Sequence, residues 1–210
     1  MNILLTAAQL RLLALALMLV DHAGLVFFPG QIWMRCLGRL AFPIFAFQAA
    51  EGYRYTRDFR RYCLRLTIFA LISEIPFNLM AFRTSFYPGH QNVMFTLLLG
   101  LIACRLYDLN NGWVMIPVFL AAALLRPDYG ILGVAAVLLF YIYREDKPAQ
   151  LLFLVLINCF GYGSASIQSF AALAWIPISL YRGEKGRVGK AVQYGSYIFY
   201  PLHMLILGFV

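Results

Sequence analysis

The chain has 210 residues, of which 62% are hydrophobic and only 12% are charged. An average soluble domain carries about 25% charged residues, so this composition argues against a water-soluble protein and predicts one integral membrane domain over residues 1–210. The net charge of +8 comes from basic residues that gather in a few loops, so membrane topology explains it and no nucleic-acid partner is expected.

Turns and charged residues divide the chain into about nine apolar segments. We expect them near residues 7–28, 31–53, 61–82, 92–108, 112–125, 129–143, 149–161, 165–181 and 193–209. A helix needs about 20 apolar residues to cross a bilayer, and several of these segments are shorter. The first segment is too long for a signal peptide and lacks a small-residue cleavage site, so we expect it to be retained. The predicted fold is an all-α, polytopic membrane bundle with about nine transmembrane segments.

Basic residues in the loops predict the orientation of this bundle. They follow the second, sixth and eighth segments, and they include Arg54, Arg57, Arg60, Arg61, Arg144, Lys147, Arg182, Lys185, Arg187 and Lys190. Nine crossings place all of these loops on the side of the N-terminus. Because cytoplasmic loops carry an excess of Lys and Arg, the N-terminus is expected inside and the C-terminus outside.

Asp21 and His22 are a polar pair in the first apolar segment. A charged side chain at the centre of a membrane helix costs roughly 2.5–3.5 kcal/mol, so such residues usually face a protein interior or a watery cavity. Asp21 requires a cationic partner, for which Arg35 and Arg39 are the candidates. His22 is a candidate general base, because the unperturbed pKa of an imidazole is about 6.5 and small shifts select its protonation state. A purely structural network of ion pairs would explain the same residues.

Arg11 lies 11 residues before His22 on the same face of a helix, about 16 Å away along the axis. This is about the span of an extended pantetheine arm, so Arg11 could hold a phosphate while the thioester reaches His22. Alternatively, Arg11 extends to the lipid headgroups and His22 is a structural hydrogen-bond donor. The cluster Arg54, Arg57, Arg60, Arg61 and Arg65 has two interpretations as well: it can set the topology and bind anionic lipid, or it can receive a nucleotide phosphate.

Other polar residues are expected in the outer half of the membrane. Glu74 and Asn78 lie on one helix face around Pro76, where a kink would suit a polar cavity wall, although Glu74 could simply neutralise an arginine. Asn92, Asp128 and His203 are placed at similar depths. Three histidines and four scattered cysteines show no metal-ligand spacing, so no metal site is expected.

Several motifs, read together in chain order, resemble the TraX family. They are MLVDH at 18–22, GRLAFPIF at 38–45, EG at 51–52 followed by TR at 56–57, SEIPFN at 73–78, NVMFT at 92–96, DYG at 128–130 and YPLH at 200–203. The resemblance implies an acetyltransferase that uses acetyl-CoA, with the N-terminal amine of a pilin as acceptor in the named member. A weaker likeness connects Arg11, His22 and the pair Arg54 and Arg57 to transmembrane acyltransferases that modify cell-surface sugars, in which the histidine is held to be essential.

The resemblance and the predicted topology together imply a mechanism in the bacterial inner membrane. His22, with Asp21 or Glu74, would take a proton from an amine or hydroxyl at the outer face, and Arg39 would stabilise the oxyanion. The expected acetyl-CoA ligands are Arg11, Arg54, Arg57, Arg60 and Arg61. The expected contacts to the acceptor, a pilin-like peptide or a glycan, are Asn78, Asn92, Asp128 and His203. The competing hypothesis is a protein without enzymatic activity: a transporter, or a component of a secretion or conjugation machine that contacts membrane lipid.

Overall fold

The computed structural model describes residues 4–109, 112–163, 166–184, 186 and 190–210. Within these ranges the regular structure is helical, as the sequence predicts. The elements are α1 (Ala7–Val26), α2 (Ile32–Gly38), α3 (Ala41–Tyr55), α4 (Phe59–Phe82), α5 (Val93–Asp108), the 3₁₀ turn η1 (Gly112–Val114), α6 (Met115–Leu125), α7 (Gly130–Ile142), α8 (Lys147–Val155), the π turn η2 (Leu156–Gly161), the 3₁₀ helix η3 (Ile167–Ala174), α9 (Trp175–Ser179) and α10 (Lys190–Gly208).

The expected apolar segment at 31–53 is interrupted, because Arg39 and Leu40 divide it into α2 and α3. The segments at 112–125, 149–161 and 165–181 only change helix type along their length, from η1 to α6, from α8 to η2 and from η3 to α9. In the part of the chain that the structure describes, α1 and α4 are long and apolar enough to cross a membrane, whereas the apolar helices between residues 113 and 179 have 10–17 residues. The nine crossings therefore stay a prediction.

Polar side chains start four of the helices by accepting a backbone N–H that has no partner inside the helix. Thr6 accepts from Gln9 at the start of α1, and the Gln9 side chain accepts the Thr6 N–H in return. Asp58 starts α4 and Asp146 starts α8 in the same way. Asn92 starts α5 by accepting the N–H of Met94. Each cap of this kind typically contributes about 1 kcal/mol to stability.

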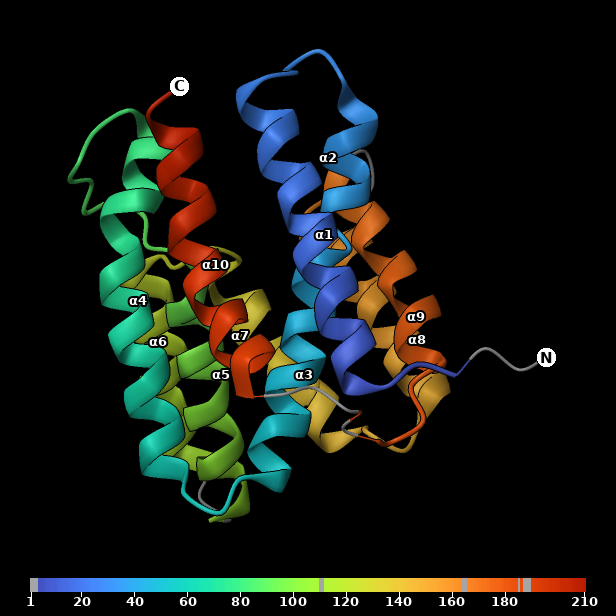
Figure 1. Cartoon of the computed structure of the whole chain (residues 1–210). Coiled ribbons are helices and arrows are strands. Elements are labelled where there is room, and N and C mark those ends of the chain that lie inside the picture. The colour runs from blue at the N-terminus through green and yellow to red at the C-terminus, as the bar shows by residue number, and fades with distance from the viewer. Residues whose placement is uncertain (1–3, 110–111, 164–165, 185, 187–189) are drawn as a thin grey trace.

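The connections between helices lie at several levels of the bundle. The turn from α1 to α2 and the end of α10 lie at the upper end in Figure 1, and the loop from α4 to α5 descends from there toward the middle, where the turn from α6 to α7 lies. The turns from α3 to α4 and from α7 to α8 lie at the lower end. The loops that carry Arg57 and Arg144 therefore share one end of the molecule, as the pattern of basic residues predicts.

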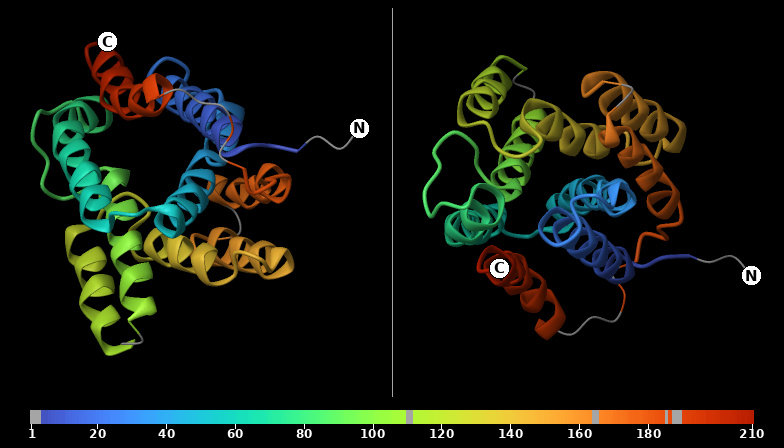
Figure 2. Two further views of the ribbon diagram at one scale, coloured as in Figure 1. Left: turned by 60° about the horizontal axis from the view of Figure 1, so that its bottom comes forward. Right: turned by 90° about the horizontal axis from the view of Figure 1, so that it is seen from above.

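Helices α1, α3, α4 and α10 form a ring when the bundle is viewed along its length (Figure 2). Helix α10 packs mainly against α4 and less extensively against α1, whereas α5 and α7 pack against each other and against α3. The core lies between these last three helices, where Ile44, Leu101 and Phe140 are fully buried. Large apolar side chains of α4, among them Leu71 and Ile75, are instead exposed on the outer surface.

Candidate functional site

Three cavities follow one another along the ring of helices. The upper chamber, of about 210 Å³, is lined by the polar residues Asp21, His22, Arg35, Arg39, His90 and Asp128. The middle chamber, of about 100 Å³, is lined mostly by apolar side chains such as Leu15, Leu66, Met94 and Leu97. The lower chamber, of about 440 Å³, is lined by Arg11, Arg65, Glu51 and several tyrosines.

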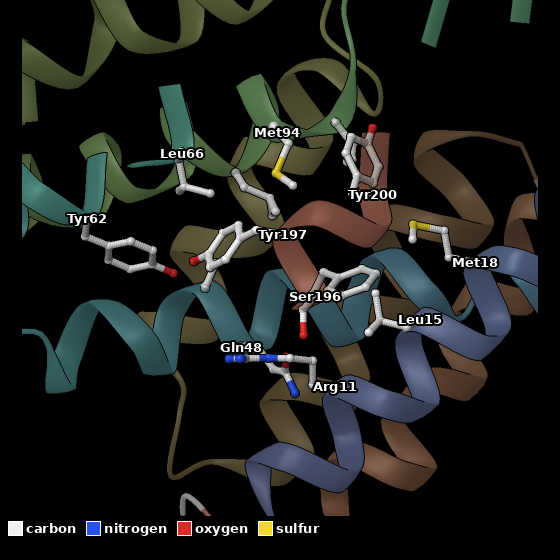
Figure 3. Close-up of a pocket in the computed structure, with 14 residues that line it drawn as sticks. Arg11, Leu15, Met18, Gln48, Tyr62, Leu66, Met94, Ser196, Tyr197 and Tyr200 are labelled. Atoms are coloured by element: carbon white, nitrogen blue, oxygen red, sulfur yellow. The ribbon is translucent and has the colours of Figure 1, made fainter. Parts of the chain in front are cut away.

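Neighbouring chambers share parts of their walls. Met18, Phe45, Val93 and Tyr200 line both the upper and the middle chamber. Arg11, Gln48, Tyr62 and Tyr197 line both the middle and the lower chamber. Figure 3 shows the middle chamber with Arg11 and Gln48 on one side and Tyr200 and Met18 on the other. The three cavities thus form a series that runs from one end of the bundle to the other.

Asp21 anchors a charged network in the wall of the upper chamber. Its carboxylate is buried and contacts both expected candidates, with Arg35 Nη1 at 3.1 Å from Oδ1 and Arg39 Nη2 at 2.9 Å from Oδ2. The Nη1 group of Arg35 also donates to the main-chain carbonyl of Asp21. A Cβ atom at Gly38 would lie 2.1 Å from Cβ of Asp21, so only glycine allows α2 to approach α1 this closely.

The network leaves the Nε–H of Arg39 without a protein partner. This nitrogen is buried and has no hydrogen bond to any described residue. Because Arg39 lines the upper chamber, its guanidinium can donate to a polar ligand there. One carboxylate and two guanidinium groups give this network a net positive charge, which suits an oxygen atom that gains negative charge during a reaction.

His22 is held in a chain of hydrogen bonds between α1 and α10. His203 Nδ1 lies 2.7 Å from the main-chain oxygen of Phe199, and since a carbonyl only accepts, this nitrogen carries the hydrogen. His203 Nε2 then accepts from Nδ1–H of His22, also at 2.7 Å, with the ring planes 7° apart. These hydrogen bonds leave Nε2 as the nitrogen of His22 that can take a proton. His22, unlike His203, lines the upper chamber.

A turn between α6 and α7 presents Asp128 at the same chamber. The carbonyl of Asp128 accepts from the Thr96 hydroxyl, and its carboxylate lies 3.7 Å from Nε2 of His90. Tyr129 has a φ of +67°, a left-handed conformation that costs energy in a residue with a side chain, and its ring stacks on Phe42. Backbone strain of this kind clusters at binding and active sites, and here it fixes the position of a half-exposed carboxylate.

Arg65 in α4 extends into the lower chamber between two tyrosine rings. Its guanidinium carbon lies 5.3 Å from the ring centre of Tyr62 and 5.2 Å from that of Tyr197. Its Nε is buried and, among the described residues, makes no hydrogen bond. Arg11 lines the same chamber from α1.

The remaining predicted site residues lie outside the chamber linings. Glu74 accepts from the main-chain N–H of Asn92 at 2.9 Å and from its side-chain amide, so both residues hold the start of α5. Asn78 is buried in α4. The four arginines expected to hold phosphate are exposed at the lower end: Arg54, Arg57, Arg60 and Arg61. Among the described residues no group of three or more His, Cys, Asp or Glu side chains could hold a metal ion.

These features define an all-helical bundle with a polar, histidine-bearing chamber at one end and an arginine-lined chamber at the other. The chain belongs to the TraX family, because the family model described as TraX protein matches residues 6–210. It is 30% identical to a probable fimbrial assembly protein, FimC, of Dichelobacter nodosus, over 98% of this chain and 96% of that protein. It is 26% identical to the TraX protein of Escherichia coli, over 95% of this chain and 84% of that protein. No solved structure matches the chain.

Proposed function

We propose that the protein is a membrane-embedded acetyltransferase of the bacterial inner membrane. It would take acetyl-CoA at the lower end and transfer the acetyl group to an amine or hydroxyl in the upper chamber. The observation that carries this proposal is the orientation of His22: its Nδ1–H is committed to His203, so the lone pair of Nε2 is available in a polar chamber. An imidazole held in one tautomer by a second group is the usual arrangement of a general base.

The chemistry assigned to the upper chamber needs a base and an oxyanion donor, and the chain supplies both. Nε2 of His22 takes the proton of the acceptor as its nitrogen or oxygen bonds to the thioester carbonyl. The negative charge on that carbonyl oxygen is stabilised by the free N–H of Arg39. When the carbon–sulfur bond breaks, the protonated His22 returns the proton to the departing thiolate. Asp21 keeps Arg35 and Arg39 in place and takes no proton in this scheme.

The middle chamber suits the arm of the donor. It is narrow and mostly apolar, and it lies between the chamber of Arg11 and the chamber of His22. Arg11 and His22 are separated by about 16 Å along α1, a distance that an extended pantetheine arm spans. The thioester would thus reach the base while the nucleotide end stays in the lower chamber.

Two features support a membrane location and this orientation. The outward side chains of α4 are large and apolar, as expected for a helix that contacts lipid. The basic loops after α3 and α7 share the lower end, which the excess of Lys and Arg in cytoplasmic loops would place inside the cell. The upper chamber would then face the periplasm.

The relatives support a pilin-like acceptor. One of them is named as a probable fimbrial assembly protein, and the resemblance to the TraX family implies a pilin acceptor. A pilin-like peptide with a free N-terminal amine is therefore the first acceptor to test, followed by a glycan hydroxyl.

The decisive experiment measures acetyl transfer by the purified protein in lipid nanodiscs, with labelled acetyl-CoA and a pilin-like peptide. His22→Gln should abolish transfer, whereas Leu12→Ala, on the exposed side of the same helix, should leave it unchanged. Full transfer by His22→Gln would rule out the assigned base. If the wild-type protein transfers no acetyl group but drives solute flux across vesicles, the protein is a transporter.

A further inference from the structure

The lower chamber holds more positive charge than its own carboxylate can neutralise. Arg11 and Arg65 both line it, and neither forms an ion pair with another described residue. Glu51 lines the chamber too, but its carboxylate lies 3.5 Å from Nε of Arg144, which is outside the lining. Two guanidinium groups therefore line a cavity between helices, and among the described residues neither of them is paired with a carboxylate.

Arg65 has the features of a residue that is held ready for a ligand. Tyr62 and Tyr197 fix its guanidinium by contacts with both rings. Its buried Nε–H lacks an acceptor among the described residues, and a buried donor without a partner is unfavourable. An oxyanion in the chamber would accept this hydrogen, and the planar fork of arginine matches two oxygens of a phosphate.

The rest of the lining points to a ligand that is also flat and aromatic at one end. Tyr55 and Tyr181 add two further rings to those of Tyr62 and Tyr197. Aromatic rings stack with nucleotide bases regardless of their identity. The volume of about 440 Å³ is in the range of small-molecule sites. The arginines on the surface are less suitable, because they are exposed to solvent and Arg61 already pairs with Asp58 at 3.0 Å.

We propose that the lower chamber binds the diphosphate of a nucleotide, with Arg65 and Arg11 on the phosphate oxygens and the tyrosines beside the base. This inference rests on the proposed function in that coenzyme A contains such a diphosphate. Within the expected basic cluster, it assigns the phosphate to Arg65 and not to the exposed arginines 54, 57, 60 and 61, which lie nearer the start of α4 or before it.

The test measures the affinity of the full chain in zwitterionic nanodiscs for three probes: coenzyme A, ADP and pantetheine, which has no phosphate. Arg65→Gln should weaken binding of coenzyme A and ADP by about 10- to 100-fold, because charge-assisted hydrogen bonds are lost, and leave pantetheine binding unchanged. Arg65→Lys keeps the charge but not the fork and should give an intermediate loss. Arg105→Gln, an exposed arginine outside the chambers, is the matched control and should bind like the wild type. If Arg65→Gln fails to fold, Arg65→Lys carries the test.

The outcomes separate this inference from the proposed function. Unchanged ADP affinity in the Arg65 variants, or a loss seen only when Arg57 and Arg60 are replaced, overturns the site even if acetyl transfer is normal. Loss of ADP binding when phosphatidylglycerol is added to the nanodiscs shows that the chamber takes lipid headgroups, which also overturns it. ADP binding that depends on Arg65, in a protein without acetyl transfer, supports the site and refutes the proposed function.

Discussion

Replacing His203 by leucine removes the group that fixes the proton of His22. In the wild-type protein the Phe199 carbonyl places a hydrogen on Nδ1 of His203, and His203 Nε2 in turn accepts from Nδ1 of His22. Leucine can neither accept nor donate a hydrogen bond. Nδ1–H of His22 would then be unpaired, and the ring would turn or carry its hydrogen on Nε2 instead. Either change removes the lone pair from the upper chamber.

The size of the effect follows from the cost of that unpaired donor. A buried donor without an acceptor costs roughly 1–3 kcal/mol. In the variant, the form of His22 with its hydrogen on Nδ1 is destabilised by this free energy relative to the turned ring or the other tautomer. Since each 1.36 kcal/mol changes a rate tenfold, kcat should fall about 5- to 150-fold. KM for acetyl-CoA should change little, because His203 lies outside the three chamber linings.

The assay is steady-state acetyl transfer at several pH values, compared with two other variants. His203→Gln offers an oxygen that can accept from Nδ1–H and should recover part of kcat. Met204→Leu, a change of similar volume at the next buried position of α10, should retain wild-type kcat. A wild-type kcat for His203→Leu, in a protein that folds normally, would refute the assignment of the tautomer. If KM rose by a similar factor while kcat stayed unchanged, His203 would contact the substrate instead.

Three further predictions concern stability and are checked by the free energy of unfolding in detergent. Gly38→Ala must move α2 away from α1, because the new Cβ would lie 2.1 Å from Cβ of Asp21 and needs at least 3.4 Å. This movement should lower the free energy of unfolding by about 1–3 kcal/mol and lengthen both ion pairs of Asp21. An unchanged free energy of unfolding would contradict the close approach. Asp21→Asn leaves Arg35 and Arg39 without their anion and should cost about 3–5 kcal/mol, and an unchanged stability would contradict the buried ion pairs. Asn92→Ala removes the cap of α5 and also the amide hydrogen bonds to Glu74 and to the Ala70 carbonyl, so it should cost more than the roughly 0.5–2 kcal/mol of a cap alone; a smaller loss would contradict these buried contacts.

Hydrophobicity and charge were sufficient to predict the helical class and the grouping of the loops, since both depend on properties averaged over many residues. The partner of Asp21 was also predictable, because Arg35 and Arg39 follow within 18 residues and a buried carboxylate needs a cation. The break between α2 and α3 was not, because the run GRLAFPIF is apolar throughout apart from Arg39. There the tertiary contact of Gly38 with α1 decides the backbone path.

The site was predicted less completely, because its geometry depends on contacts between distant parts of the chain. His22 and His203 are 181 residues apart, so nothing in the sequence indicates that their rings would share a hydrogen bond. Glu74 seemed suited to a cavity wall, yet it pairs with Asn92 because the turn after α4 folds the start of α5 back onto that helix. The sequence placed Arg65 in the basic cluster, but it did not separate this residue from the exposed arginines, because its contacts with Tyr62 and Tyr197 depend on the packing of α4 against α10.

The hydrogen bond between His22 and His203 also sets an order of assembly. His22 is made with α1, but the carbonyl that aligns it belongs to α10, which is made about 180 residues later. Until α10 packs against α1 and α4, the imidazole is free to adopt either tautomer. On the proposed mechanism, a nascent chain would therefore consume thioester less readily while α10 is still emerging from the ribosome.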